Sequence, residues 1–180
     1  EKYGFKTEKV SVDREGFVSL EKLREKIDKN TILASFSAVN NEIGTIQPIR
    51  EILEIVKDKN PNTIFHTDLS DAYGRIPFNV KKILIDLATL SSYKILGPRG
   101  IGALYVKEDF RLQRIIEGQI GTQRLWPGVE NTPAIVGFAK ASELAFQNFE
   151  QNISHMKRLR DKLIDGILNN IDETLLNGPA

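Results

Sequence analysis

Four residues of this 180-residue chain carry side chains that could act together in catalysis. They are an amide, a carboxylate, a hydroxyl and an amine: Asn41, Asp68, Ser91 and Lys94. Lys94 follows Asp68 at about the separation that one strand end, a crossover and the next strand require. A lysine beside a carboxylate fits two chemistries. One is a plain ion pair, and the other is a Schiff-base lysine whose aspartate partner holds the protonated pyridine nitrogen of pyridoxal phosphate.

Apolar and amphipathic segments alternate along the first part of the chain and define the elements that must position these residues. The pattern predicts strands at 9–12, 31–37, 63–67, 87–91 and 102–106, and helices at 19–27 and 48–58. Strands separated by helices predict an α/β fold, with a mostly parallel sheet and flanking helices. In such a sheet, functional residues gather beyond the carboxyl ends of the strands.

Two long helical patterns follow at 132–149 and 153–169, where the strand and helix alternation stops. In the second pattern, Leu159, Leu163 and Ile167 recur at helical spacing and predict a stripe that packs into a core. The change in pattern near residue 130 is the one compositional boundary in the sequence. We therefore expect a division into residues 1–130 and residues 131–180.

Composition excludes several classes of function. The chain has 25 Lys and Arg residues against 24 Asp and Glu, so no strong charge points to a nucleic-acid partner. It contains no Cys and only two His residues, which argues against a disulfide framework and against a metal site. No apolar run approaches the roughly 18–20 residues that a membrane helix needs, so no membrane partner is expected. We predict a cytoplasmic protein.

Several ordered motifs are specific enough to indicate a family. They are Val39-Asn40-Asn41-Glu42-Ile43-Gly44, His66-Thr67-Asp68, Ser91-Ser92-Tyr93-Lys94, Gly97-Pro98-Arg99-Gly100-Ile101-Gly102 and Pro127-Gly128-Val129-Glu130-Asn131-Thr132-Pro133. Together they cover nearly the whole chain, which resembles the cysteine desulfurase family in the class V aminotransferase group. These are fold type I pyridoxal-phosphate enzymes. The resemblance implies that residues 1–130 are part of the cofactor-binding large domain, and that residues 131–180 are linking helices and the start of a small domain.

The resemblance also implies roles for individual residues. Lys94 would form the covalent link to the cofactor, and Asp68 would pair with its pyridine nitrogen. Asn41 would hydrogen-bond the phenolic oxygen of the cofactor, and Ser91 would bind its phosphate. Asp71 and Tyr93 stand at two further cofactor-binding positions.

This chain departs from the family pattern at several positions. Asp71 stands where the family usually has Gln, and a carboxylate donates a hydrogen bond only when it is protonated. Tyr93 stands where the family usually has His, and it can still carry a proton, at a higher pKa. Thr122-Gln123 replaces a Glu-Arg pair. Val129 replaces a threonine that reaches the cofactor phosphate across the dimer, and it offers no hydrogen bond.

The function that the resemblance implies is removal of sulfur from L-cysteine, giving alanine and an enzyme persulfide for sulfur and iron-sulfur cluster metabolism. The partners it implies are the amino-acid substrate, a second copy in a homodimer and a sulfur-acceptor protein. The chain begins without Met and ends on a turn signal, so we expect a piece of a longer enzyme that is inactive alone. Its upstream phosphate-binding loop and its downstream reactive cysteine would lie outside this sequence.

Simpler interpretations of the same residues remain open. Asp68 and Lys94 could be a structural ion pair, Asn41 could cap the following helix, and Ser91 could satisfy nearby backbone groups. At the level of function, two alternatives stand beside a desulfurase. One is another class V aminotransferase or lyase, and the other is a split or degenerate subunit without chemistry of its own.

Overall fold

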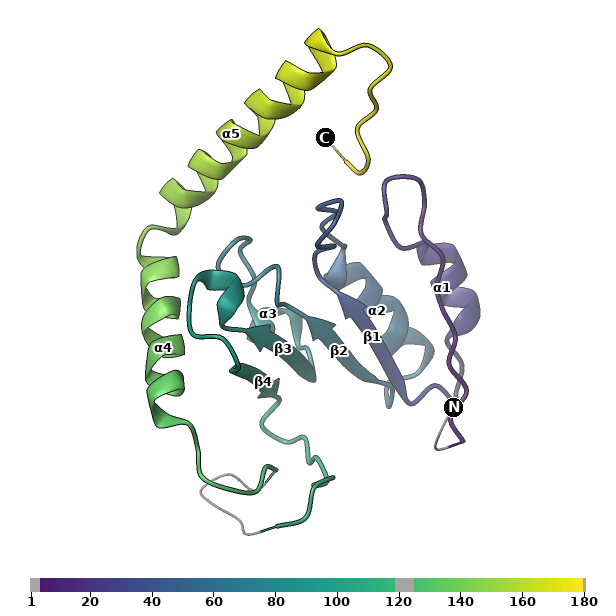
Figure 1. Ribbon diagram of the computed structural model, residues 1–180. Coiled ribbons are helices and arrows are strands. Elements are labelled where there is room, and N and C mark those ends of the chain that lie inside the picture. The colour runs from purple at the N-terminus through teal and green to yellow at the C-terminus, as the bar shows by residue number, and fades with distance from the viewer. Residues whose placement is uncertain (1–3, 119–124, 180) are drawn as a thin grey trace.

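The computed structural model describes residues 4–118 and 125–179 (Figure 1). Four strands form one sheet in the order β1 (Leu33–Ser37), β2 (Ile64–Asp68), β3 (Leu87–Ser91) and β4 (Gly102–Val106). The first three strands run parallel, and β4 returns antiparallel to β3. The predicted α/β fold with a mostly parallel sheet and flanking helices is confirmed.

One face of the sheet is buried beneath helices because apolar side chains alternate along its strands. In β2, Phe65 and Thr67 are fully buried, whereas His66 and Asp68 on the opposite face are only partly buried. The helices α1 (Leu20–Lys26) and α2 (Ile49–Lys59) contribute Leu23, Ile52 and Val56 to the same core cluster as Phe65. His66 and Asp68 therefore lie on the face away from these helices.

Helix boundaries follow recognisable local signals. The side chain of Ser19 caps α1 by accepting a hydrogen bond from the Lys22 amide, as its position in the sequence predicts. The short helix α3 (Val80–Ile83) starts at Asn79, whose side chain accepts bonds from two amides. The sequence pattern missed α3, because one helical turn is too short to produce a periodicity. The strand expected at 9–12 is wrong: Val12 makes only an isolated bridge with Val18.

The buried carboxylate of Asp86 ties the sheet to α2. Its Oδ2 atom accepts from Lys57 Nζ at 2.6 Å and from the Phe65 amide at 2.9 Å, while Lys107 Nζ lies 3.8 Å from Oδ1. The three partners come from α2, from β2 and from the end of β4. A buried charge with this many partners holds these elements in register.

Replacing Asp86 by Ala is expected to lower the free energy of unfolding by about 2–3 kcal/mol, because a buried amide and an ammonium lose their acceptor. Chemical denaturation of the complete protein measures this loss. The matched control is Asp58→Ala, because Asp58 is exposed and its carboxylate lies 3.6 Å from Arg24. The control is expected to cost less than about 1 kcal/mol. Equal losses in the two variants would contradict a structural role for Asp86.

Two helices follow the sheet, α4 (Thr132–Gln147) and α5 (Phe149–Asn170). The side chain of Asn131 caps α4, and this helix packs against the turn that carries Lys94. α5 runs on beyond the sheet, and the tail after it turns back (Figure 1). The predicted core stripe on α5 is wrong for this chain, since Leu159 is 51% and Leu163 64% exposed. No helix within the described ranges is both long and apolar enough to cross a membrane.

Candidate active site

The parallel strands bring the predicted site residues to one edge of the sheet. Asp68 is the last residue of β2 and Ser91 the last residue of β3. Asn41 lies in the turn that follows β1, and Lys94 lies in the single 3-10 turn η1 (Tyr93–Ile95) that follows β3. Because β1, β2 and β3 run parallel, all four residues lie at or beyond the carboxyl edge of the sheet.

The amine of Lys94 is held by Asp71 and not by Asp68. Lys94 Nζ donates to Asp71 Oδ1 at 2.8 Å, and both side chains are largely buried. Arg75 Nη1 lies 3.2 Å from the same oxygen, and Arg75 Nη2 donates to the Lys94 carbonyl at 2.8 Å. The simple ion pair between Asp68 and Lys94, one of the two interpretations of the sequence, is therefore replaced by a pair with Asp71.

Asp71 determines the protonation of Lys94. The hydrogen bond from Lys94 to Asp71 raises the pKa of the lysine above its usual value. Burial opposes this effect, the charge of Asp71 and Tyr93 add to it, and the nearby charge of Arg75 lowers the lysine pKa. The ammonium also lies 5.5 Å from the centre of the Tyr93 ring, within the range of a cation–π contact. Lys94 is thus a cation at neutral pH and must release its proton before it can act as a nucleophile.

Asp68 is an anion in this arrangement. Burial alone would raise the pKa of Asp68, but hydrogen bonds from Ser70 and Thr89, together with nearby His66, lower it below its usual value. The Ser70 amide donates to Asp68 Oδ1 at 2.8 Å. Burial lowers the pKa of His66, whose Nδ1 lies 2.7 Å from the Ser35 hydroxyl. The edge therefore presents a carboxylate that can hold a cationic group.

The side chain of Asn41 does not stabilise the turn that follows β1. Asn40, not Asn41, stabilises this turn, because Asn40 Oδ1 accepts from the amides of Glu42 and Ile43 at 2.8 and 3.0 Å. The following helix α2 begins at Pro48 without any side-chain cap. The capping role considered for Asn41 is therefore wrong. The side chain of Asn41 is exposed in the turn.

Comparison with known proteins identifies the family. The pattern that defines the family described as "Aminotransferase class-V" matches residues 1–180. The chain belongs to this family. It is 46% identical over 178 residues to cysteine desulfurase IscS 1 of Archaeoglobus fulgidus, an alignment that covers 99% of this chain and 46% of the relative. It is 45% identical over 179 residues to cysteine desulfurase IscS of Clostridium botulinum strain Hall, with 99% and 45% covered.

Solved structures agree with this membership of the class V family. A NifS-like protein superposes with a TM-score of 0.90 at 40% identity, covering 93% of this chain and 46% of that structure. DndA from Streptomyces lividans superposes with a TM-score of 0.86 at 29% identity, with 98% and 50% covered. The chain spans about half the length of the curated relatives it matches. The expected resemblance to cysteine desulfurases of the class V group is confirmed.

The residues at the sheet edge fit pyridoxal phosphate, the cofactor of class V enzymes. Asp68 is already anionic, which matches a protonated pyridine nitrogen. Lys94 offers a primary amine that is held beside the Asp71 carboxylate. Asn41, in the turn after β1, and Ser91, at the end of β3, supply hydrogen-bond donors at the same edge of the sheet. The donor set therefore matches the charges and polar groups of the cofactor.

The positions that depart from the class V pattern differ in their surroundings. Tyr93 is half exposed and lies beside Lys94, while Val129 is 98% exposed. Thr122 and Gln123 lie outside the described residues. Arg75 is a residue that the sequence interpretation missed, although its spacing of four from Asp71 is typical of a side-chain pair on one helical turn.

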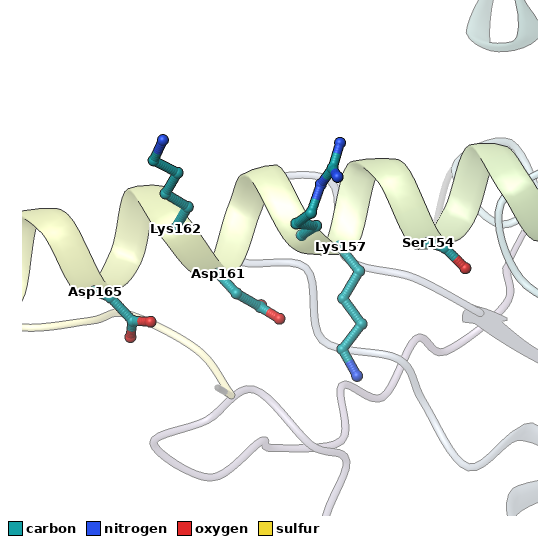
Figure 2. Close-up of a pocket in the computed structure, with 6 residues that line it drawn as sticks. Ser154, Lys157, Asp161, Lys162 and Asp165 are labelled. Atoms are coloured by element: carbon teal, nitrogen blue, oxygen red, sulfur yellow. The ribbon is translucent and has the colours of Figure 1, made fainter.

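Neither of two hollows found elsewhere on this class V chain is lined by the four candidate residues. One is an open groove of about 600 Å³ along α5. Figure 2 shows the residues that line it, all from this helix: Ser154, Lys157, Arg158, Asp161, Lys162 and Asp165. A second, apolar hollow of about 360 Å³ includes Leu69, Tyr73 and Phe78 among its lining residues. Among the residues that the structure describes, no cluster of His, Asp and Glu is arranged to hold a metal ion. The candidate site is therefore the group of residues at the carboxyl edge of the sheet, and neither hollow is part of it.

Proposed function

We propose that the protein containing this chain is a pyridoxal-phosphate-dependent cysteine desulfurase. It would take sulfur from L-cysteine, give alanine and an enzyme persulfide, and supply sulfur or iron-sulfur cluster metabolism. The observation that carries the proposal is the set of Asn41, Asp68, Ser91 and Lys94 at one sheet edge, in a chain whose relatives are named cysteine desulfurases. The neighbour SspA, solved in complex with cysteine, adds support for this substrate.

Each residue has a role in this proposal. Lys94 would carry the covalent link to the cofactor, and Asp68 would keep the pyridine nitrogen protonated. Asn41 would donate to the phenolic oxygen, and Ser91 would donate to the phosphate. When bound, the cofactor supplies a ring that accepts electron density from the substrate.

The proton of Lys94 would move within the site. Lys94 Nζ is 2.8 Å from Asp71 Oδ1, so the carboxylate holds Lys94 as an ammonium until the amine gives up its proton. Tyr93 lies beside the same amine, and its hydroxyl is a group able to carry a proton. Asp71 would thus bind the Lys94 ammonium and Tyr93 would handle a proton, in place of the Gln and His usual at these positions.

The larger assembly belongs to the same proposal. Residues 1–130 would form part of the cofactor-binding domain, and residues 131–180 would link it to a small domain. A cytoplasmic homodimer that passes sulfur to an acceptor protein is what the likeness to the IscS relatives supports. The exposed apolar side chains of α5 are consistent with a helix that packs against further protein.

The test of the proposal is a product assay. The complete protein, loaded with pyridoxal phosphate, is given L-cysteine and then a panel of other amino acids, and alanine, sulfide and keto acids are measured. With an excess of a reducing thiol present, which releases the persulfide sulfur as sulfide, alanine and sulfide from cysteine in equal amounts are expected. Keto acids or products from another amino acid would instead support a different class V aminotransferase or lyase, the alternative raised by Asp71 and Tyr93 at the positions of the usual Gln and His. Absence of any product would indicate a non-catalytic subunit.

Replacing Asp68 by Asn is expected to lower the turnover number by about 10²–10³-fold, because a neutral amide no longer holds the ring nitrogen protonated. Asp68→Glu, which keeps the charge, is expected to recover part of the loss. Steady-state kinetics with cysteine measure both variants. Equal activity in Asp68→Asn and the unmodified protein would remove Asp68 from the site.

A further inference from the structure

Arg75 contacts the backbone of Lys94 and the carboxylate that binds the Lys94 amine. Its Nη2 atom donates to the Lys94 backbone carbonyl at 2.8 Å, and its Nη1 atom lies 3.2 Å from Asp71 Oδ1. Lys94 Nζ donates to that same oxygen at 2.8 Å. The three residues therefore form a closed ring of contacts that runs from the backbone of Lys94 to its amine.

We propose that Arg75 is a positioning residue for Lys94, fixing the turn that carries the lysine and sharing the carboxylate that holds its amine. The inference rests on the proposed role of Lys94 as the residue linked to the cofactor. Arg75 is not expected to touch the cofactor itself. It acts through Asp71 and through the Lys94 carbonyl.

The positioning effect comes from the geometry of the guanidinium group. Its planar fork can bond two acceptors at once, whereas a lysine ammonium acts as a single point charge. Here the two acceptors are the Asp71 carboxylate and the Lys94 carbonyl, which belong to different segments joined to β2 and β3. Arg75 therefore cross-links the segment after β2 to the turn η1. Loss of this link would leave the amine of Lys94 free to occupy more positions.

The electrostatic effect comes from the shared oxygen. Asp71 Oδ1 faces two cations, so Arg75 competes with Lys94 for this carboxylate. Arg75 weakens the hold of Asp71 on the ammonium and makes the neutral amine easier to form, in agreement with its lowering effect on the Lys94 pKa. A neutral Gln at the Asp71 position would hold neither cation by charge.

Two further elements lie beside Lys94, the rest of its own turn and the helix α4. Tyr93, in the same turn, favours the ammonium form. On α4, which packs against η1, Lys140 and Glu143 bond each other at 2.7 Å. The prediction is therefore that changes at Asp71 and Arg75 shift the protonation of Lys94 in opposite directions.

The first readout is the reactivity of Lys94 in the cofactor-free complete protein. Competitive labelling with acetic anhydride across a range of pH, read by mass spectrometry, reports how much neutral amine each lysine offers. Arg75→Gln is expected to slow Lys94 labelling at neutral pH by about two- to fivefold, and Asp71→Asn to accelerate it by a similar factor. Lys157 on α5 is the internal reference. Arg50→Gln, on the exposed face of α2, is the matched control variant and leaves Lys94 labelling unchanged.

The second readout separates positioning from charge. At one fixed pH, the rate of pyridoxal phosphate attachment is divided by the fraction of neutral Lys94 that labelling gives for the same variant. After this division, Arg75→Gln is still expected to attach the cofactor more slowly than the unmodified protein. Arg75→Lys keeps the charge but not the fork, so it is expected to restore the labelling profile and not the attachment rate. Circular dichroism confirms that each variant is folded.

Two results would overturn the inference: Lys94 labelling that moves in the same direction in Arg75→Gln and Asp71→Asn, or labelling and attachment that are both unchanged in Arg75→Gln. These outcomes are distinct from failure of the proposed function. That failure would appear as an unmodified protein whose Lys94 never binds the cofactor.

Discussion

Replacing Lys94 by Ala in the complete protein is expected to abolish covalent cofactor binding and to lower cysteine turnover by at least about 10³-fold. No other side chain named at the site carries a primary amine, so none of them can take its place. Borohydride reduction followed by peptide mapping should find the cofactor on Lys94 in the unmodified protein and on no peptide in the variant.

Two further variants separate chemistry from folding in this test. Lys94→Arg keeps a cation beside Asp71, 2.8 Å from the present amine, but it provides no primary amine to react with the aldehyde. It is expected to be as inactive as Lys94→Ala and to remain as stable as the unmodified protein. Lys140→Ala removes an exposed lysine of α4 that pairs with Glu143, and it should retain full cofactor binding. Cofactor fixed by reduction in Lys94→Ala would place the covalent link elsewhere.

The parts of the fold that the sequence predicted are those decided by local periodicity. The strands β3 and β4 have the bounds expected from their apolar runs, and α1 begins after Ser19, where a cap was expected. The segment 9–12 has the alternation of a strand, but it pairs only through the bridge from Val12 to Val18. Periodicity therefore located the strands of the sheet, and it did not reveal which segment lacks a partner strand.

The carboxylate that pairs with Lys94 could not be predicted from the sequence around it, because the pairing depends on how the turns after the strands are placed in space. Strand ends alone suggested Asp68, but the Asp68 carboxylate accepts from the Ser70 amide two residues on. The single turn η1 was too short to predict, and it is this turn that carries Lys94 to Asp71. The role of Arg75 could not be predicted either, because one of its two hydrogen bonds goes to the backbone carbonyl of Lys94, which a pattern of side-chain types does not reveal.

The apolar stripe on α5 shows a different limit of sequence interpretation. Leu159, Leu163 and Ile167 have the spacing of a buried face, yet they are exposed in this chain. Helical spacing identifies a face that favours burial, but it does not say which protein surface covers that face. The relatives are about twice as long as this chain, so the pattern is consistent with packing that extends beyond the 180 residues.

A polypeptide made of these 180 residues alone is expected to release no sulfide from cysteine above background. Sulfur transfer to an enzyme persulfide requires a thiolate acceptor, and the chain contains no Cys. Its cofactor affinity should also be poor, because charge-assisted hydrogen bonds to phosphate provide much of the anchoring and Val129 offers none. Slow, weak attachment of the cofactor to Lys94 is the most that this polypeptide should show.

The measurement for the isolated polypeptide is sulfide release with added pyridoxal phosphate, compared with the cofactor alone and with the Lys94→Ala variant of the same polypeptide. The free cofactor controls for uncatalysed release, and the variant controls for reaction at other amines. Circular dichroism establishes that the polypeptide is folded, so that inactivity reflects the missing thiol and phosphate contacts. Turnover clearly above both controls would mean that these residues already form a complete site. A thiol on the substrate itself, rather than an enzyme cysteine, would then have to accept the sulfur.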